Sequence, residues 1–379
     1  MDFSDSSTVR RPTWAEVDLR ALTLNLGFIQ GHIGAGRRTI AVIKANAYGH
    51  GAVELARRLE ELGVSYLAVA ILEEALELRA AGIKLPILLL NGFWPGQEEL
   101  IVHHGLTPAV DEAEKVRALN RVAERMKRKA CYHLKINTGM SRLGADWEQA
   151  KPLIESALQH QWAHCQGIFT HLSSSDDMAS SETVRQLERF NCVLKDLQTR
   201  GFSPEWTHAA NSAAVLRWPG SWYDAVRPGL ILYGVNPFEK EPTQLRPLLA
   251  LKTQLMHLRP IKKGTSVGYG CSYTASRNSV IAALPIGYAD GYNRLLSNRG
   301  SVLVCGQRVP IIGRISMDLT LVDVTDLLTA KPGAEVVLIG KQGSEQIGVG
   351  ELAELCHTIP YEILTGISQR VPRVFLNPQ

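Results

Sequence analysis

Lys44 is the first residue whose type and position suggest chemistry. It ends a short apolar run, Ile40–Ile43, and the segment ANAYGHG follows it. A lysine at the dry end of a strand is unusual, because loss of water disfavours its charge and lowers its pKa. The glycines and the tyrosine hydroxyl after it can let the backbone approach a phosphate. This combination suits a cofactor that binds through a Schiff base, whereas the alternative is a lysine whose charged end reaches solvent.

Histidine and cysteine residues give little support for a metal site. His160 and His164 are four residues apart, which would put both rings on one face of a helix. No acidic or cysteine residue accompanies them on that face, and none of the six cysteines belongs to a CxxC pair. We therefore expect no metal and predict free thiols in a reducing cytoplasm.

The elements that position Lys44 alternate between strand and helix patterns up to residue 245. A helix is predicted after Asp18, a good N-cap residue, because apolar residues then recur at steps of three and four. Eight apolar runs with little polar alternation follow, which is typical of parallel strands covered on both faces. They favour a TIM-type (β/α)8 barrel over a doubly wound sheet, since no early strand precedes a GxGxxG motif. The runs are TIAVIK (39–44), SYLAVA (65–70), LPILLL (85–90), LTPAV (106–110), ACYHLKI (130–136), CQGIFTH (165–171), EWTHAA (205–210) and YDAVR (223–227).

The pattern changes near the segment EPTQLRP (241–247). Short runs of Val, Ile and Leu now alternate with Gly, Pro and Asp, which is typical of β structure. One helix is predicted, at about 350–357. We therefore predict an α/β plus β protein, with a barrel over residues 12–245 and a mainly β C-terminal domain over residues 246–379.

The composition is that of an ordinary globular protein. The chain has 379 residues and a net charge of +4, and its mean hydropathy is −0.04. Its basic residues are scattered, no window of 18 residues is predominantly apolar, and the N-terminus has no apolar signal segment. These features predict neither a nucleic acid nor a membrane partner, and they favour a cytoplasmic location.

Eight sequence blocks, in the same order, resemble those of the alanine racemases, which use pyridoxal 5'-phosphate (PLP). The resemblance covers nearly the whole chain beyond the first ten residues, and the family's fold, a PLP-binding barrel followed by a β domain, agrees with the prediction above. In that family the first strand, here near 13–17, associates with the C-terminal domain. The blocks are AVIKANAYGHG (41–51), LKINTGMSRLG (134–144), HAANSAA (208–214), VRPGLILYG (226–234), GYGCSYTA (268–275), PIGYADGY (285–292), GRISMD (313–318) and IPYEILTGISQRVPR (359–373).

The resemblance implies a racemase with two bases. Lys44 would be the Schiff-base lysine and, once freed, the acid or base on one face of the substrate, and Tyr269 would act from the opposite face. Arg142 would stabilise the Tyr269 phenolate and bind the substrate carboxylate. Arg227 would donate a hydrogen bond to the pyridine nitrogen and leave it unprotonated, because arginine keeps its own proton. The cofactor is then a weaker electron sink, which suits racemisation better than transamination.

The remaining site residues are also implied by the resemblance. Lys135 corresponds to a lysine that is often carbamylated, and Met317 would offer a backbone N–H to the substrate carboxylate. Asn137 departs from the family, where an aspartate is more familiar. The expected cofactor-binding residues besides Lys44 and Arg227 are Tyr48, His171, Ser212, Gly229, Leu230 and Tyr361. The expected supporting residues besides Lys135 are His208, Tyr288 and Asp318.

The family resemblance also implies a homodimer, in which Tyr269, Tyr288 and Met317 of one subunit complete the site around Lys44 of the other. The predicted reaction is the interconversion of L- and D-alanine, which supplies D-alanine for peptidoglycan. Three alternatives stay open: a serine or broad-specificity racemase on the same scaffold, a PLP-dependent decarboxylase, and a PLP-binding homeostasis protein without catalysis. A metal-dependent barrel hydrolase is a further alternative, but paired His and Asp residues at strand ends are missing.

Overall fold

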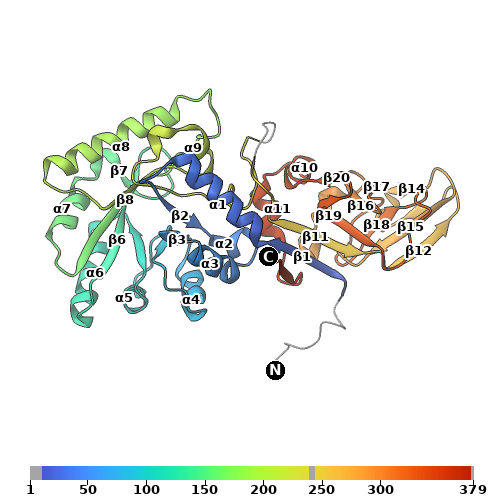
Figure 1. Ribbon diagram of the computed structural model, residues 1–379, viewed down its shortest axis with the longest axis horizontal. Coiled ribbons are helices and arrows are strands. Elements are labelled where there is room, and N and C mark those ends of the chain that lie inside the picture. The colour runs from blue at the N-terminus through green and yellow to red at the C-terminus, as the bar shows by residue number, and fades with distance from the viewer. Residues whose placement is uncertain (1–10, 239–243, 377–379) are drawn as a thin grey trace. The chain divides into compact units, whose positions relative to one another are not determined.

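The computed structural model describes residues 11–238 and 244–376, which form two compact units (Figure 1). Of the described residues, the barrel unit comprises 22–47, 51–238 and 244–246. The sheet unit comprises 11–21, 48–50 and 247–376. Within the described residues, no helix is long and apolar enough to cross a membrane.

The strands of the barrel unit form a closed ring, which confirms the predicted barrel. Each strand pairs in parallel with its neighbours, and β10 closes the ring by pairing with both β9 and β2. Every predicted apolar run overlaps one of these strands. They are β2 (Arg38–Val42), β3 (Tyr66–Val69), β4 (Ile87–Leu89), β5 (Thr107–Val110), β6 (Ala130–Asn137), β8 (Ala163–Phe169), β9 (Trp206–His208) and β10 (Ala225–Val226). The short strand β7 (Ala145–Asp146) pairs with the end of β6.

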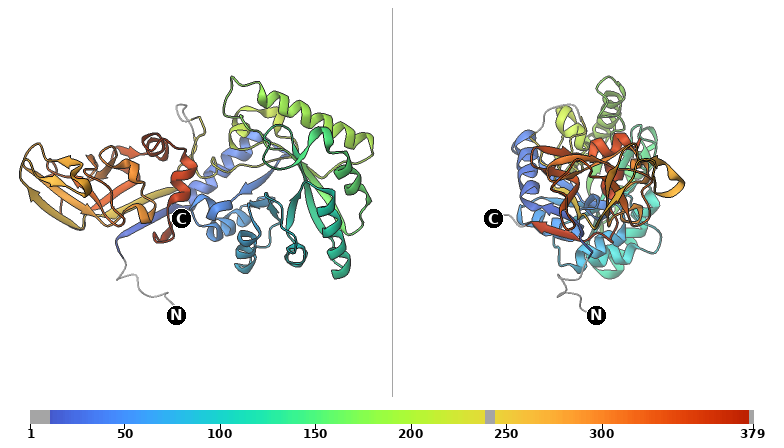
Figure 2. Two further views of the ribbon diagram at one scale, coloured as in Figure 1. Left: turned by 180° about the vertical axis from the view of Figure 1, so that it is seen from behind. Right: turned by 90° about the vertical axis from the view of Figure 1, so that its right-hand side faces the viewer.

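Helices surround the barrel strands, as both views of the ribbon show (Figures 1 and 2). The first helix begins where Asp18 caps it, because Asp18 Oδ1 accepts hydrogen bonds from the backbone N–H groups of Arg20 and Ala21 at 2.8 and 3.1 Å. This confirms the predicted N-cap. The helices are α1 (Leu19–Ile33), α3 (Ala52–Glu61), α4 (Leu72–Ala80), α5 (Glu98–His104), α6 (Ala113–Met126), α7 (Lys151–Gln159), α8 (Glu182–Thr199) and α9 (Ser212–Arg217).

The two histidines that could share a helix face do not share a helix. Helix α7 ends at Gln159, and the next residue, His160, is extended. His164 lies in β8, where its Nε2 atom is 3.3 Å from a carboxylate oxygen of Glu205. The expectation that both histidines lie on one helix face was therefore wrong, because β8 begins between them, at Ala163.

The sheet unit is mainly β, as predicted. Its largest sheet has the order β17-β16-β19-β11-β1-β21, with β20 paired to β19; β12, β15 and β18 form a second sheet, and β13 and β14 a hairpin. The strands are β1 (Thr13–Asp18), β11 (Leu249–Gln254), β12 (His257–Ile261), β13 (Ser266–Val267), β14 (Tyr273–Thr274), β15 (Ser279–Leu284), β16 (Ser301–Val304), β17 (Gln307–Pro310), β18 (Thr320–Asp323), β19 (Glu335–Gln342), β20 (Glu345–Ile347) and β21 (Arg373–Leu376).

The position of β1 differs from the domain boundary expected at residue 12. Strand β1 pairs antiparallel with β11 and parallel with β21, so its backbone hydrogen bonds place it in the sheet unit. The predicted helix near 350–357 is α10 (Val349–Leu355), and a second helix, α11 (Pro360–Gly366), was not predicted.

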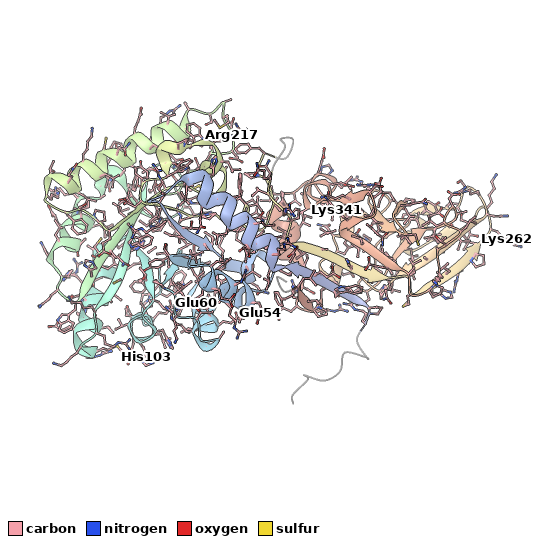
Figure 3. All side chains as sticks on the ribbon, viewed as in Figure 1. Glu54, Glu60, His103, Arg217, Lys262 and Lys341 are labelled. Carbon is pink, nitrogen blue, oxygen red and sulfur yellow. The ribbon has the colours of Figure 1, made fainter. Side chains whose placement is uncertain are left out.

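Charged side chains lie mostly on the outside of each unit. His103 and Arg217 of the barrel unit and Lys262 of the sheet unit are exposed (Figure 3). Lys135 and Arg227 are exceptions, because both lie inside the barrel at 8% and 4% exposure. Cations removed from water in this way need compensating partners, so they identify the region to examine.

Candidate active site

Lys44 follows β2 directly and begins an unusual backbone turn, α2 (Lys44–Tyr48). The residues after the lysine share a φ angle of 52°, in the left-handed region. A left-handed turn costs about 1–2 kcal/mol for each residue with a side chain, so other contacts must stabilise it. The residues with this angle are Ala45, Asn46, Ala47 and Tyr48.

Two side chains hold this turn. Glu74 Oε1 accepts a hydrogen bond from the N–H group of Ala45 at 2.5 Å, and Glu74 Oε2 accepts from the N–H group of Ala70 at 2.7 Å. Asn46 Oδ1 accepts from the N–H group of Ala52, the first residue of α3, at 2.8 Å. Lys44 is therefore attached to a backbone that is anchored on both sides.

Lys44 is one of several cations of the barrel unit that act on His171 through their charges. Burial lowers the pKa of the Lys44 amine, the charge of Arg142 lowers it further, and the charge of Glu74 opposes both effects. Burial also lowers the pKa of His171 well below its usual value, and four nearby cations contribute to this. These cations are Arg227, Lys135, Arg142 and Lys44. Such a cluster favours neutral amines and attracts anions.

Lys135 is the most affected amine of the cluster. Burial, followed by the charges of Arg227 and Arg142, lowers its pKa to about 7, although Asp111 opposes the shift. Its Nζ atom lies 4.3 Å from the centroid of the Phe169 ring. The carboxylate of Asp111 is already shared, because it accepts a hydrogen bond from Lys115 at 2.7 Å. Lys135 therefore has a large neutral fraction near pH 7.

Arg227 is buried among neutral acceptors. Its Nη1 atom is 2.6 Å from Nδ1 of His208, and its Nη2 atom donates to the carbonyl oxygens of Thr170 and Ala209 at 2.7 and 3.0 Å. Nη2 is also 3.4 Å from Nδ1 of His171. Burial lowers the pKa of Arg227 to about 9. These contacts hold the guanidinium rigidly without neutralising its charge.

Arg142 lies in the loop after β6 and is exposed. The loop is shaped by Asn137, whose Oδ1 atom accepts hydrogen bonds from the N–H groups of Gly139 and Ser141 at 3.1 and 2.9 Å. The side chain that departs from the family pattern therefore organises the backbone immediately before Arg142.

Three of the expected cofactor-binding residues, Ser212, Gly229 and Leu230, lie together in the barrel unit. Ser212, at the start of α9, accepts hydrogen bonds through its Oγ atom from the N–H groups of Gly229 and Ile231 at 2.9 and 3.4 Å. Leu230 lies between these two residues and is buried. The structure thus brings Ser212, Gly229 and Leu230 together as a small group of hydroxyl and backbone donors.

Two further expected cofactor-binding residues, Tyr48 and Tyr361, lie in the sheet unit. Their ring centroids are 5.6 Å apart. Burial, with a smaller effect of Tyr361, raises the pKa of Tyr48, so its hydroxyl keeps its proton. Gly49 beside it has a φ angle of 81°, and a Cβ atom there would lie 2.3 Å from the carbonyl oxygen of Leu364, so only glycine fits.

Tyr269 lies on the surface of the sheet unit, and 71% of it is exposed. It borders a cavity of about 350 Å³ that Arg314 also lines. The backbone of the next residue, Gly270, passes close to this arginine. A Cβ atom at position 270 would lie only 2.9 Å from Nη1 of Arg314. Tyr269 is thus an exposed aromatic residue at the border of a cavity that a cation of its own unit also lines.

Tyr288 and Met317 are also exposed, and backbone hydrogen bonds hold their loops together. The N–H group of Tyr288 donates to the carbonyl of Ser316, and that of Ala289 to the carbonyl of Met317, both at 3.0 Å. Asp318, the next residue along the chain, accepts a hydrogen bond from Arg370 at 2.7 Å.

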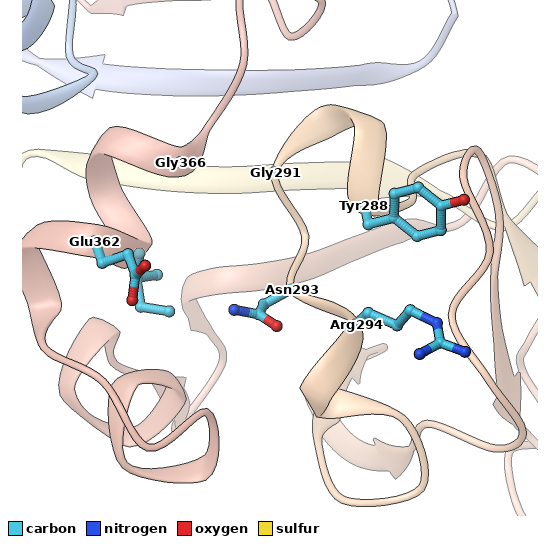
Figure 4. Close-up of a pocket in the computed structure, with 7 residues that line it drawn as sticks. Tyr288, Gly291, Asn293, Arg294, Glu362 and Gly366 are labelled. Atoms are coloured by element: carbon cyan, nitrogen blue, oxygen red, sulfur yellow. The ribbon is translucent and has the colours of Figure 1, made fainter.

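The loop after Tyr288 borders a second cavity of the sheet unit, of about 450 Å³. Figure 4 shows Tyr288 and Arg294 on one side of it and Glu362 on the other, with Asn293 between them. The exposed aromatic side chains of this unit therefore stand beside open space.

Sequence reasoning missed several positioning residues. Glu74 lies in an ordinary amphipathic helix pattern, and no motif distinguishes it. The residue type of Asn46 could have indicated the left-handed turn, since asparagine is one of the few residues that tolerate a left-handed backbone. Asp290 is fully buried and bound by Arg11 through two hydrogen bonds, at 2.6 and 2.8 Å, although 279 residues separate the two.

Comparisons with known proteins agree with this arrangement. Residues 17–237 match the sequence profile of the alanine racemase N-terminal domain, and residues 248–375 match that of the alanine racemase C-terminal domain. The alanine racemase of Carboxydothermus hydrogenoformans is 44% identical over 97% of this chain and 100% of its own length.

Two solved structures superpose closely on the chain. The alanine racemase of Bacillus anthracis with bound L-Ala-P has a TM-score of 0.91 and 36% identity, over 98% of this chain and 96% of that one. The alanine racemase of Bartonella henselae with covalently bound pyridoxal phosphate has a TM-score of 0.88 and 34% identity, over 97% of this chain and 100% of that one.

The barrel interior fits such a cofactor. Lys44 offers an amine of lowered pKa, Arg227 offers donors held by neutral acceptors, and Ser212 offers a hydroxyl among backbone N–H groups. A surplus of cations suits a group that carries a phosphate. The chain thus belongs to the alanine racemase family, whose members are PLP-dependent isomerases.

Proposed function

We propose that this protein interconverts L- and D-alanine, with Lys44 and Tyr269 as the two bases. The observation that carries the proposal is the burial of Arg227 among neutral acceptors, in a barrel unit whose lysine at the end of β2, Lys44, has a lowered pKa. An arginine in this position donates a hydrogen bond and gives no proton away, which distinguishes a racemase from PLP enzymes that place a carboxylate there.

Lys44 is suited to move a proton. Burial and the charge of Arg142 increase its neutral fraction, and a neutral amine can accept a proton from the substrate α-carbon. The anchored turn after Lys44 limits the positions that its amine can reach. PLP, when bound, delocalises the negative charge that develops at that carbon.

Tyr269 supplies the proton on the opposite face, and it comes from the sheet unit of a second subunit. Its 71% exposure is consistent with a side chain that becomes covered by a partner, as are the 53% exposure of Met317 and the 42% exposure of Tyr288. Arg142 of the barrel binds the substrate carboxylate and stabilises the phenolate. The active enzyme is then a homodimer with shared sites.

The product has a biological use that matches the reaction. D-alanine is a component of peptidoglycan, and we infer that this enzyme supplies it in the cytoplasm. Alanine is preferred over larger amino acids because Tyr288 and Tyr361 narrow the entrance to the site.

The decisive experiment measures exchange of the α-proton of alanine in D2O by the PLP-loaded enzyme. Borohydride reduction followed by peptide mapping identifies the lysine that holds the cofactor. We expect exchange with both enantiomers and an adduct on Lys44, and an adduct on any other residue contradicts the proposal.

The same preparation tests the alternatives. A yellow protein that exchanges no α-proton is a PLP-binding protein without catalysis, and release of CO2 from a basic amino acid indicates a decarboxylase. A higher kcat/KM for serine than for alanine indicates a serine or broad-specificity racemase.

A further inference from the structure

A third histidine, His133 of β6, lies directly behind His208 inside the barrel. Nδ1 of His133 is 2.9 Å from Nε2 of His208, and Nδ1 of His208 is 2.6 Å from Nη1 of Arg227. Both rings are fully buried, at 0% exposure. The three side chains therefore form one continuous line of polar contacts.

Arg227 determines the direction of the hydrogen bonds along this line. A guanidinium only donates, so Nδ1 of His208 must accept, and the neutral ring of His208 must carry its proton on Nε2. This Nε2–H group donates a hydrogen bond to Nδ1 of His133, so the neutral His133 ring must carry its own proton on Nε2. If His133 carried its proton on Nδ1 instead, two N–H groups, Nδ1–H of His133 and Nε2–H of His208, would face each other without an acceptor.

The surroundings keep both rings neutral, as this assignment requires. Burial is the main cause that lowers the pKa of His133 to about 3, and it also lowers the pKa of His208 well below its usual value. Among the described residues, no atom meets full hydrogen-bond geometry with Nε2 of His133, but a side-chain hydrogen-bonding interaction with Gln166 acts to raise the pKa of the ring. The line of histidines therefore ends at His133, next to this glutamine, and its role is to orient the groups within it.

The barrel provides a fitted space for the His133 ring. Gly167 of β8 lies opposite His133 in the strand pairing, and a Cβ atom on this glycine would come within 2.8 Å of Nδ1 and Cε1 of the ring. On the other side of the line, the His208 ring stacks on Phe169 with centroids 4.8 Å apart and planes inclined by 11°. Both imidazoles are thus held by packing as well as by hydrogen bonds.

We propose that His133 is a positioning residue of the cofactor site, whose Nδ1 atom accepts a hydrogen bond from the Nε2–H group of His208 and thereby keeps Nδ1 of His208 turned toward Arg227. The role rests on the proposed function, because it matters for catalysis only where Arg227 faces the pyridine nitrogen. Without His133, the Nε2–H group of His208 is buried without an acceptor. A turned ring would then remove the acceptor that holds the Arg227 guanidinium.

The test uses substitutions that differ in the position of their acceptor atom. In His133→Asn the amide oxygen takes the place of Nδ1, in His133→Gln it reaches the place of Nε2, and His133→Phe has no acceptor. Gly167→Ala leaves His133 in the chain but displaces its ring. We expect Asn to preserve the contact with His208 and the other three changes to break it.

The first readout is the ¹⁵N NMR spectrum of the histidine rings in the full-length apoenzyme. In the wild type, His208 and His133 should both be neutral and protonated on Nε2. His133→Phe, His133→Gln and Gly167→Ala should shift the His208 nitrogen signals, and His133→Asn should restore them. This readout involves no cofactor, so an error in the proposed role of Arg227 leaves it unchanged.

The second readout is the steady-state kinetics and the visible absorption spectrum of the PLP-loaded enzyme. His133→Phe should lower kcat about five- to tenfold with little change in KM for alanine, and should shift the visible absorption maximum. His133→Asn should recover most of both. The proposal is overturned if wild-type His208 carries its proton on Nδ1, or if Asn and Gln at position 133 behave alike.

Discussion

The amide nitrogen of Asn137 donates a hydrogen bond to Oδ1 of Asp146 over 2.6 Å, and the two residues are paired in the register of β6 and β7. An aspartate at position 137 could not make this bond. The departure from the family pattern is therefore matched by a second residue, and the pair holds the ends of the loop that carries Arg142.

Asn137→Asp tests this relationship. Two carboxylates at this distance repel, so the loop should loosen and KM for alanine should rise about fivefold, the equivalent of one hydrogen bond. The double change Asn137→Asp with Asp146→Asn reverses donor and acceptor and should restore KM. Steady-state kinetics on the single and double variants measures KM for alanine. A KM that stays raised in the double variant would contradict a role for the hydrogen bond between residues 137 and 146.

Glu74 should influence Lys44 through its charge. Glu74→Gln removes a charge that raises the pKa of Lys44, so this pKa should fall further. Because the Lys44 amine is free only in the substrate complex, the acidic limb of the kcat profile should move to lower pH. Glu73→Gln is the matched control, because Glu73 is the exposed neighbour in the same turn of α4. A limb that moves equally in both variants would show that Glu74 has no specific role.

Lys135 should make stability depend on pH. Its pKa is lowered from 10.5 to about 7 on folding, so the unfolded chain binds more protons between these values. Stability should therefore rise with pH across this range, by at most about 1.4 kcal/mol per pH unit, and the rise should be absent in Lys135→Met. Urea unfolding of the apoenzyme in bicarbonate-free buffer measures the difference.

The neutral amine of Lys135 should also react with carbon dioxide to form a carbamate. We expect ¹³C-bicarbonate to give a carbamate signal in the NMR spectrum of the wild type and none in Lys135→Met. The new negative charge would balance the cations around it, so removal of bicarbonate should lower activity reversibly.

The buried pair of Arg11 and Asp290 should stabilise the sheet unit. Burial acts to raise the pKa of Asp290, but the hydrogen bonds from Arg11 and from the backbone of Gly287, with the charges of Arg11 and Arg370, together outweigh it and the pKa is lowered. Arg11→Met leaves a fully buried carboxylate without its main partner, and should cost about 2–3 kcal/mol at pH 7, less than for a pair buried on both sides. This stabilisation is lost as the pH falls below the unfolded-state value near 4, so both proteins should converge in acid. Chemical denaturation at pH 7 and pH 3 tests this, with Arg20→Met as the control.

Mixing two inactive variants tests the shared site. Lys44→Ala and Tyr269→Phe chains should each have little activity, and after subunit exchange about a quarter of the wild-type sites should be intact. No recovery in a mixture that is shown to contain mixed dimers would contradict a site built from two chains.

The barrel strands could be predicted because their apolar runs are continuous and regularly spaced. The turn after Lys44 could not, because ANAY suggests an ordinary helix start, whereas its left-handed backbone depends on Glu74, 29 residues away. His133 was hidden for a similar reason, since it lies within an apolar run and its partner His208 belongs to another strand. Local pattern thus predicted the framework, and contacts between distant segments determined the details of the site.

The placement of β1 has a consequence for how the chain is made. Strand β1 precedes the barrel strands in the chain but must pair with β11 and β21, which both follow them. The sheet unit can therefore be completed only after the whole barrel sequence has been synthesised. A fragment that begins at residue 246 would lack its central neighbour strand and expose two unpaired edges, so the C-terminal region should aggregate when it is expressed alone.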